Sequence, residues 1–249
     1  MNPESPLPPV LTPSTAPRKP WGFWKVIGGT VLALLVTGIA PVAITVAAIA
    51  LTEHSATGVT PARLEASQFS LAGWIGVAFA AVACWILARG CGRGSPRAVL
   101  GLQAVKVPVL LKWCGVALVL CVVNDGVLLL AGRPIVHESM LEIYRSVESK
   151  LMLLLVVNLQ APFIEELIMR GFCLEGLRHT KVGQRGAILL SALIWAVLHV
   201  QYELIGISQI LVGGLVYGVA RIRTGSILPT IAMHAINNLW STVELLLVV

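Results

Sequence analysis

Two adjacent carboxylates and an arginine lie inside a long apolar run that begins at Leu151. The acids are Glu165 and Glu166, and Arg170 follows the second of them by four residues. Ionisable side chains at membrane depth are costly, so they indicate a functional site. A carboxylate in such a place could activate water as a general base or help to hold a metal ion.

Helical geometry separates the two glutamates. Glu166 and Arg170 are one turn apart and share a face, so they can form an ion pair. Glu165 is rotated by about 100° from Glu166 and is left unpaired by the arginine. Pro162 removes a backbone hydrogen bond and frees the carbonyl of Asn158, which predicts a kink that admits water. The alternative is a buried ion pair that only fixes packing.

Two later apolar runs each carry one histidine. His199 follows Trp195 by four residues, and His234 precedes Asn238 by four, so each pair shares a helix face. Taken separately, they would be packing or hydrogen-bonding residues. At about 1.5 Å of rise per residue, these side chains and Glu165 all fall in one mid-membrane layer. This convergence predicts a single buried centre.

The residue types favour hydrolysis of an amide bond by activated water. We expect Glu165 and His199 to deprotonate the water, and His234 with Asn238 to donate hydrogen bonds to the oxyanion. Glu165, His199 and His234 could instead bind zinc, because two histidines, a glutamate and water form a known zinc arrangement. The absence of an H-E-x-x-H motif favours the metal-free alternative without deciding it.

The composition predicts the elements that position these residues. The chain has 249 residues, of which 57% are hydrophobic and 12% charged, whereas a soluble domain carries about 25% charged residues. The apolar runs are long enough for helices that cross a bilayer, and a membrane barrel would show short alternating segments instead. We therefore expect an all-α, polytopic transmembrane helix bundle with about seven spans, at residues 27–51, 70–87, 107–130, 151–177, 186–200, 204–220 and 226–249.

Loop charges and composition predict the orientation and the domains. Lys and Arg are concentrated before the first run and in the second, fourth and sixth connections, which places the N-terminus in the cytoplasm. The same placement explains the net charge of +6 without a nucleic-acid partner. Residues 1–25 are expected to be a disordered Pro-rich tail, residues 26–150 N-terminal transmembrane helices and residues 151–249 the catalytic core. A short surface helix is expected within residues 133–150, and Gly214 with Gly218 forms a small-residue packing face.

The three motifs resemble those of the CPBP family of intramembrane proteases, which includes type II CAAX prenyl endopeptidases and bacterial Abi proteins. The family pattern is E-E-x-x-x-R, then F-x-x-x-H, then H-x-x-x-N. The first and third motifs are complete here, and in the second Trp195 stands in place of phenylalanine. The resemblance runs from Glu165 to Asn238, and residues 1–150 carry no motif of the family.

The resemblance implies an intramembrane endopeptidase, CAAX-processing-like, that cleaves a membrane-associated protein or peptide. It implies a multi-pass protein of the bacterial plasma membrane, in contact with lipid, with either no required cofactor or zinc. The catalytic residues it implies are Glu165, His199, His234 and Asn238, with Glu166, Arg170 and Trp195 in support.

Two other functions remain open from the sequence. A non-proteolytic membrane protein of the same fold could serve bacteriocin immunity or scaffolding, as some bacterial members of the family are expected to do. A transporter or proton relay could use Glu165 and His199. Transporters often carry an inverted repeat, and none is evident in this sequence.

Overall fold

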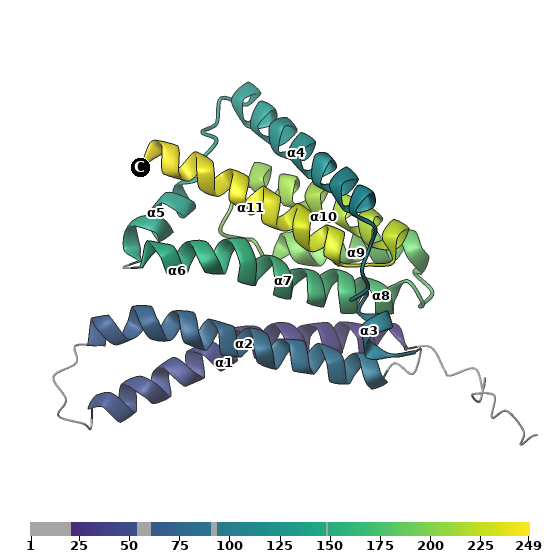
Figure 1. The fold of residues 1–249 in the computed structure, drawn as a ribbon, viewed down its shortest axis with the longest axis horizontal. Helices are drawn as coiled ribbons and strands as arrows, with labels where there is room; N and C mark the ends of the chain where they lie inside the picture. The colour runs from purple at the N-terminus through teal and green to yellow at the C-terminus, as the bar shows by residue number, and fades with distance from the viewer. Residues whose placement is uncertain (1–20, 54–60, 91–93, 148) are drawn as a thin grey trace, which may run out of the picture.

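The computed structural model describes residues 21–53, 61–90, 94–147 and 149–249, and it is all-α (Figure 1). The described part contains nine helices if the continuous run over residues 150–177 is counted once. The helices outside this run are α1 (Phe23–Glu53), α2 (Pro61–Gly90), α3 (Pro96–Val99), α4 (Val107–Leu130), α5 (Glu138–Ser146), α9 (Gly183–Val197), α10 (Leu204–Thr224) and α11 (Leu228–Val248).

The run over residues 150–177 changes its helical type twice. It consists of α6 (Lys150–Leu155), the π-helix η1 (Val156–Gln160), α7 (Ala161–Glu166), the π-helix η2 (Leu167–Cys173) and α8 (Leu174–Leu177). A π-helix bonds each carbonyl to the N–H five residues later and often marks a functional site. Both predicted glutamates lie in α7, between the two π-helices.

Among the described residues, five helical segments are long and apolar enough to cross a membrane. They are Gly73–Gly90, Val107–Leu130, Lys150–Leu177, Leu204–Thr224 and Leu228–Val248. Two further apolar segments, Phe23–Ile39 and Gly183–Val197, are shorter. Every predicted run therefore overlaps a helix, the all-α class is confirmed for the described residues, and length and composition support five spans among them. The helix α9 ends at Val197, however, so His199 lies in the turn that follows and not on the predicted helix.

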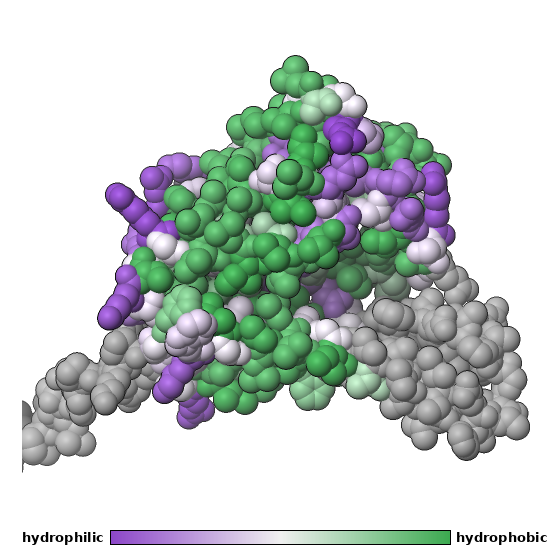
Figure 2. All heavy atoms as spheres, turned by 180° about the vertical axis from the view of Figure 1, so that it is seen from behind, coloured by the Kyte–Doolittle hydropathy of each residue, from purple (hydrophilic) through white to green (hydrophobic). Residues whose placement is uncertain are grey.

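The central run is enclosed by helices on both sides. In Figure 1, α1 and α2 pair along one side of α6–α8, and α9, α10 and α11 lie on the other, with α4 packed against α11. Every residue from Glu166 to Glu175 is buried. The outer faces are apolar: Figure 2 shows hydrophobic side chains over most of the described surface on the side turned away in Figure 1. This arrangement suits a protein that is surrounded by lipid and keeps its polar groups inside.

Two glycines allow α10 to lie close to α9, as the small-residue spacing predicted. A Cβ on Gly214 would lie 3.0 Å from the Cβ of Ala192, and one on Gly218 would lie 3.0 Å from a methyl of Ile188. Any larger residue would force the helices apart. The close approach brings the Gly214 carbonyl within reach of the central run.

Several predicted boundaries need correction. The helix α1 begins at Phe23, so residues 23–25 are helical rather than part of the tail, and residues 1–20 lie outside the described residues. The surface helix is present as α5, with no buried residue. The helix α10 continues to Thr224, so Arg221 is helical and only 2% exposed rather than a loop residue.

Candidate active site

The first glutamate of the pair is held by an indole. The Nε1–H of Trp195 donates to Oε2 of Glu165 at 2.6 Å, which joins α9 to α7. Glu165 is half-buried and Trp195 is 5% exposed. Glu165 thus keeps access to solvent or substrate on one side while a protein donor fixes its orientation.

His199 lies on the other side of the same indole. Its Nδ1 is 2.8 Å from the carbonyl oxygen of Trp195, and the two rings meet edge to face at 5.3 Å between centroids. A carbonyl only accepts, so Nδ1 is the nitrogen that donates this hydrogen bond. His199 and Glu165 thus both contact the indole of Trp195.

The second glutamate is paired on a shared face, as the spacing predicted. Oε1 of Glu166 accepts from Nη1 of Arg170 at 2.8 Å, and both side chains are completely buried. The same oxygen lies 3.2 Å from Nδ1 of His234. The Arg170 guanidinium lies over the ring of Trp195 at 4.4 Å, and its Nη2 donates to the carbonyl of Gly214 at 3.3 Å.

His234 and Asn238 lie on α11, and both contact the central run. His234 is bonded to Glu166 rather than to Glu165, and its ring meets Trp195 at 5.2 Å. Asn238 donates from Nδ2 to the carbonyl of Val157 at 2.7 Å. The amide nitrogen of Asn238 carries a second N–H, which could donate to an oxyanion. This role stays a prediction.

The bond from Asn238 follows from the π-helical register before Pro162. In η1 the N–H of Ala161 bonds the carbonyl of Val156, five residues back. The next carbonyl, Val157, would need the N–H of residue 162, which proline lacks. Asn238 supplies the missing donor. We expected Pro162 to free the carbonyl of Asn158. Because the π-turn contains one extra residue, the carbonyl that accepts a hydrogen bond from a side chain is that of Val157 instead.

Trp195 is the residue whose importance the sequence understated. The spacing predicted only a shared helix face with His199, whereas the indole also donates to Glu165 and contacts Arg170 and His234. A phenylalanine, which the resembled motif has here, could not donate. The signal was present in the sequence as a hydrogen-bonding aromatic residue within one turn of an intramembrane histidine.

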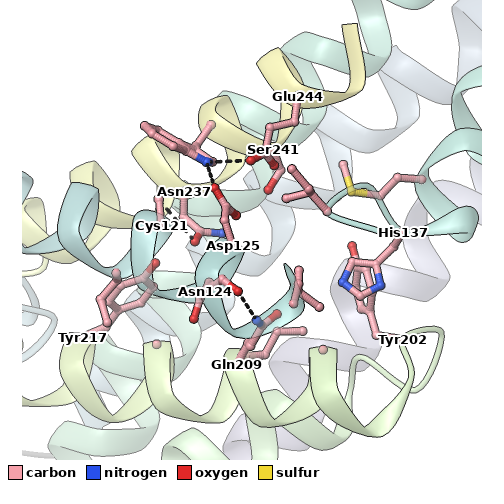
Figure 3. A pocket seen from close by; sticks show the side chains of 18 of the residues that line it. Cys121, Asn124, Asp125, His137, Tyr202, Gln209, Tyr217, Asn237, Ser241 and Glu244 are labelled. Atoms are coloured by element: carbon pink, nitrogen blue, oxygen red, sulfur yellow. Dashed lines mark hydrogen bonds between the residues drawn. The ribbon is translucent and has the colours of Figure 1, made fainter. Parts of the chain in front are cut away.

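A polar cavity of about 110 Å³ adjoins this site (Figure 3). It lies between α4, α10 and α11, and Trp195 and Tyr217 form part of its wall. Trp240 donates from Nε1 to Oδ2 of Asp125 and to Oε1 of Glu244, both at 2.8 Å. Other polar residues that line it are Cys121, Asn124, His137, Tyr202, Gln209, Asn237 and Ser241. A cavity with such walls can hold water.

Two acids of this cavity, Asp125 and Glu244, lie within predicted spans and are a signal in the sequence that could have indicated a polar site there. Two residues of its wall lie in loops and have perturbed pKa values. Burial raises the pKa of Tyr202, and the charge of Glu165 adds to the rise. Burial lowers the pKa of His137, against the opposing charge of Glu203. At neutral pH Tyr202 therefore keeps its proton and His137 is uncharged.

The predicted zinc ligands are not gathered around one point. Glu165 is bonded to Trp195, whereas His234 is bonded to Glu166. Among the described residues no three His, Cys, Asp or Glu side chains are placed to hold a metal ion. The geometry does not support the metalloendopeptidase alternative.

Part of this chain is similar to known proteins. The model of a protein family described as "Type II CAAX prenyl endopeptidase Rce1-like" matches residues 147–240. An uncharacterized 24.3 kDa protein of Escherichia coli is 29% identical over 144 residues, which cover 56% of this chain and 65% of that protein. The match thus spans less than two thirds of the length of this relative. No solved structure matches the chain.

Proposed function

We propose that this chain is an intramembrane endopeptidase, because the model of the type II CAAX prenyl endopeptidase Rce1-like family matches residues 147–240. Its substrate would be a membrane-associated protein or peptide, and its location a plasma membrane with lipid around its apolar faces. The observation that carries the proposal is that the two glutamates differ in burial and in hydrogen-bond partners. Glu166 is paired with Arg170, whereas Glu165 is half-buried and bonded to the indole of Trp195, whose ring also contacts that of His199.

In the proposed reaction, water is the nucleophile. Glu165, assisted by Nε2 of His199, accepts a proton from a water molecule as its oxygen attacks the carbonyl carbon of the scissile peptide bond. The oxyanion that forms would receive hydrogen bonds from His234 and Asn238. The same proton then passes to the leaving nitrogen as the C–N bond breaks, which gives a new carboxylic acid and a new amine; the acid then releases its proton to water and becomes a carboxylate. The polar cavity beside Trp195 would supply the water.

A non-proteolytic protein of the same fold is the second candidate. The observation that favours it is that His234 and Asn238 are both bonded to the central run, as residues with a packing role would be. The two candidates differ in one respect that can be measured directly, which is the appearance of new peptide termini.

The experiment compares membrane proteins from cells that produce the wild type, Glu165→Ala protein or neither. New N-termini and C-termini are mapped by mass spectrometry at matched levels of folded protein. We expect membrane-associated termini that appear only with the wild type. Identical termini in all three samples would favour the non-proteolytic candidate.

Metal removal provides a separate prediction. Since Glu165 and His234 bond different partners, we expect purified protein to contain substoichiometric zinc and to keep its activity in strong chelators. Zinc content is measured by atomic emission, and cleavage is assayed before and after chelation. Stoichiometric zinc that is lost together with activity, and restores activity when added back, would reverse this expectation.

We further propose seven spans with a cytoplasmic N-terminus, from the alternation of loop charges. A reporter fused after Val249 should then be extracytoplasmic, and one inserted near Lys181, in the loop between α8 and α9, should be cytoplasmic. Reporter activity on each side of the membrane measures this. A cytoplasmic reporter after Val249 would refute the seven-span count.

A further inference from the structure

The π-helix η2 leaves one backbone carbonyl without a helical donor. At its end the N–H of Leu174 bonds the carbonyl of Met169, five residues back. In α8, which follows, bonds span four residues, so the N–H of Glu175 is directed to the carbonyl of Gly171. The carbonyl of Arg170 is passed over. Nε of Arg221, on α10, donates to it at 3.3 Å.

Arg221 is fixed in a site that is built around its guanidinium. The side chain is 2% exposed, and its Nη2 donates to Oε2 of Glu175 at 3.0 Å and to the carbonyl of Val99 at 3.1 Å. Gly101 has a φ of +70°, and a Cβ there would lie 2.7 Å from the guanidinium carbon. The arginine is therefore held by acceptors on η2, α8 and α3, and Gly101, which follows α3, leaves the space that the guanidinium occupies.

The register of η2 decides where the glutamates point. Glu165, Glu166 and Arg170 precede the end of the π-helix, and α8 follows it. A π-turn contains one more residue than an α-turn, so its collapse to α would rotate the two parts relative to each other by about 100°. Such a rotation would separate Glu165 from Trp195 and Glu166 from His234.

We propose that Arg221 is a positioning residue for catalysis. Arg221 donates hydrogen bonds to the carbonyl of Arg170 and to Glu175. These bonds stabilise the π-helical register, which sets the orientation of both glutamates. The proposal rests on the proposed protease function, and it concerns a residue outside the three motifs of the site.

The test compares Arg221→Gln and Arg221→Lys with the wild type. The matched control is Arg223→Gln, because Arg223 lies two residues away on the same helix and is exposed. Three quantities are measured in detergent: kcat and KM for a substrate found by terminus mapping, the melting temperature, and amide hydrogen exchange over residues 167–177.

For Arg221→Gln we expect kcat per folded molecule to fall about 100-fold, the loss that a misplacement of about 1 Å can cause, with KM nearly unchanged. Exchange over residues 167–177 should accelerate while exchange in α4 does not. The kcat and the exchange rate of Arg221→Lys should lie between those of the wild type and Arg221→Gln, because lysine keeps the charge but lacks the guanidinium that reaches several acceptors. Arg223→Gln should match the wild type throughout.

A folded Arg221→Gln protein with wild-type kcat would overturn the proposal, even if its melting temperature falls. If Arg221→Gln does not accumulate, Arg221→Lys decides by the same criteria. If the wild type cleaves nothing, the protease function fails, and exchange over residues 167–177 separately decides whether Arg221 holds the register. Wild-type exchange there in the arginine variants would show that it does not.

Discussion

Glu165→Gln should abolish turnover and leave the melting temperature close to that of the wild type. Glutamine has the same size, and its amide oxygen can still accept the 2.6 Å hydrogen bond from Trp195. It cannot take a proton from water, and loss of a general base costs at least about 100-fold in rate. The measurements are detergent melting temperature and cleavage rate per folded molecule.

The control for this change is Glu142→Gln, which removes the charge of an exposed acid on α5 and should alter neither quantity. The roles of the two glutamates would be reversed if Glu165→Gln protein melted far below the wild type while Glu166→Gln protein was stable but inactive.

Glu166→Gln and Arg170→Gln should each destabilise the fold strongly, by about 3–5 kcal/mol, because each leaves the partner charge buried and uncompensated. The pair is 2.8 Å apart with both side chains completely buried, so water cannot replace the lost partner. The double change should recover part of the lost stability, since no charge is then stranded. Activity should fall largely because less protein folds.

Unfolding free energies of the two single variants and the double variant form a mutant cycle that isolates the interaction. The exposed pair Arg145–Glu138, at 3.9 Å, provides the control, and Arg145→Gln should change stability by less than about 1 kcal/mol. If the losses from Glu166→Gln and Arg170→Gln simply add in the double variant, the pair does not stabilise the fold in the way described.

The sequence predicted those features that depend on one helix alone. Apolar runs identified the helices, and the four-residue spacing of Glu166 and Arg170 identified their ion pair. Contacts between helices depend on the rotation of each helix about its axis, which spacing within one helix does not fix. For this reason the bond from Trp195 to Glu165, and the choice of Glu166 by His234, became visible only in the structure.

The two π-turns explain the other differences. Each extra residue shifts the helical phase, so positions counted with an α-helical period in residues 150–177 are displaced. Pro162 pointed to a local disturbance, but the carbonyl that Asn238 completes is Val157 rather than the expected Asn158. The sequence placed Arg221 in a loop because the predicted span ended at residue 220. The arginine is buried beside Glu175 because α10 continues to Thr224.

Hydrolysis in H₂¹⁸O tests the central claim most directly. Purified wild-type protein is incubated in labelled water with a substrate found by terminus mapping, and the mass of the newly formed C-terminus is measured. If Glu165 activates the attacking water, the new carboxylate should contain one ¹⁸O atom. Glu165→Gln protein with the same melting temperature should form no labelled product. Equal yields of labelled product from the wild type and Glu165→Gln would contradict the account.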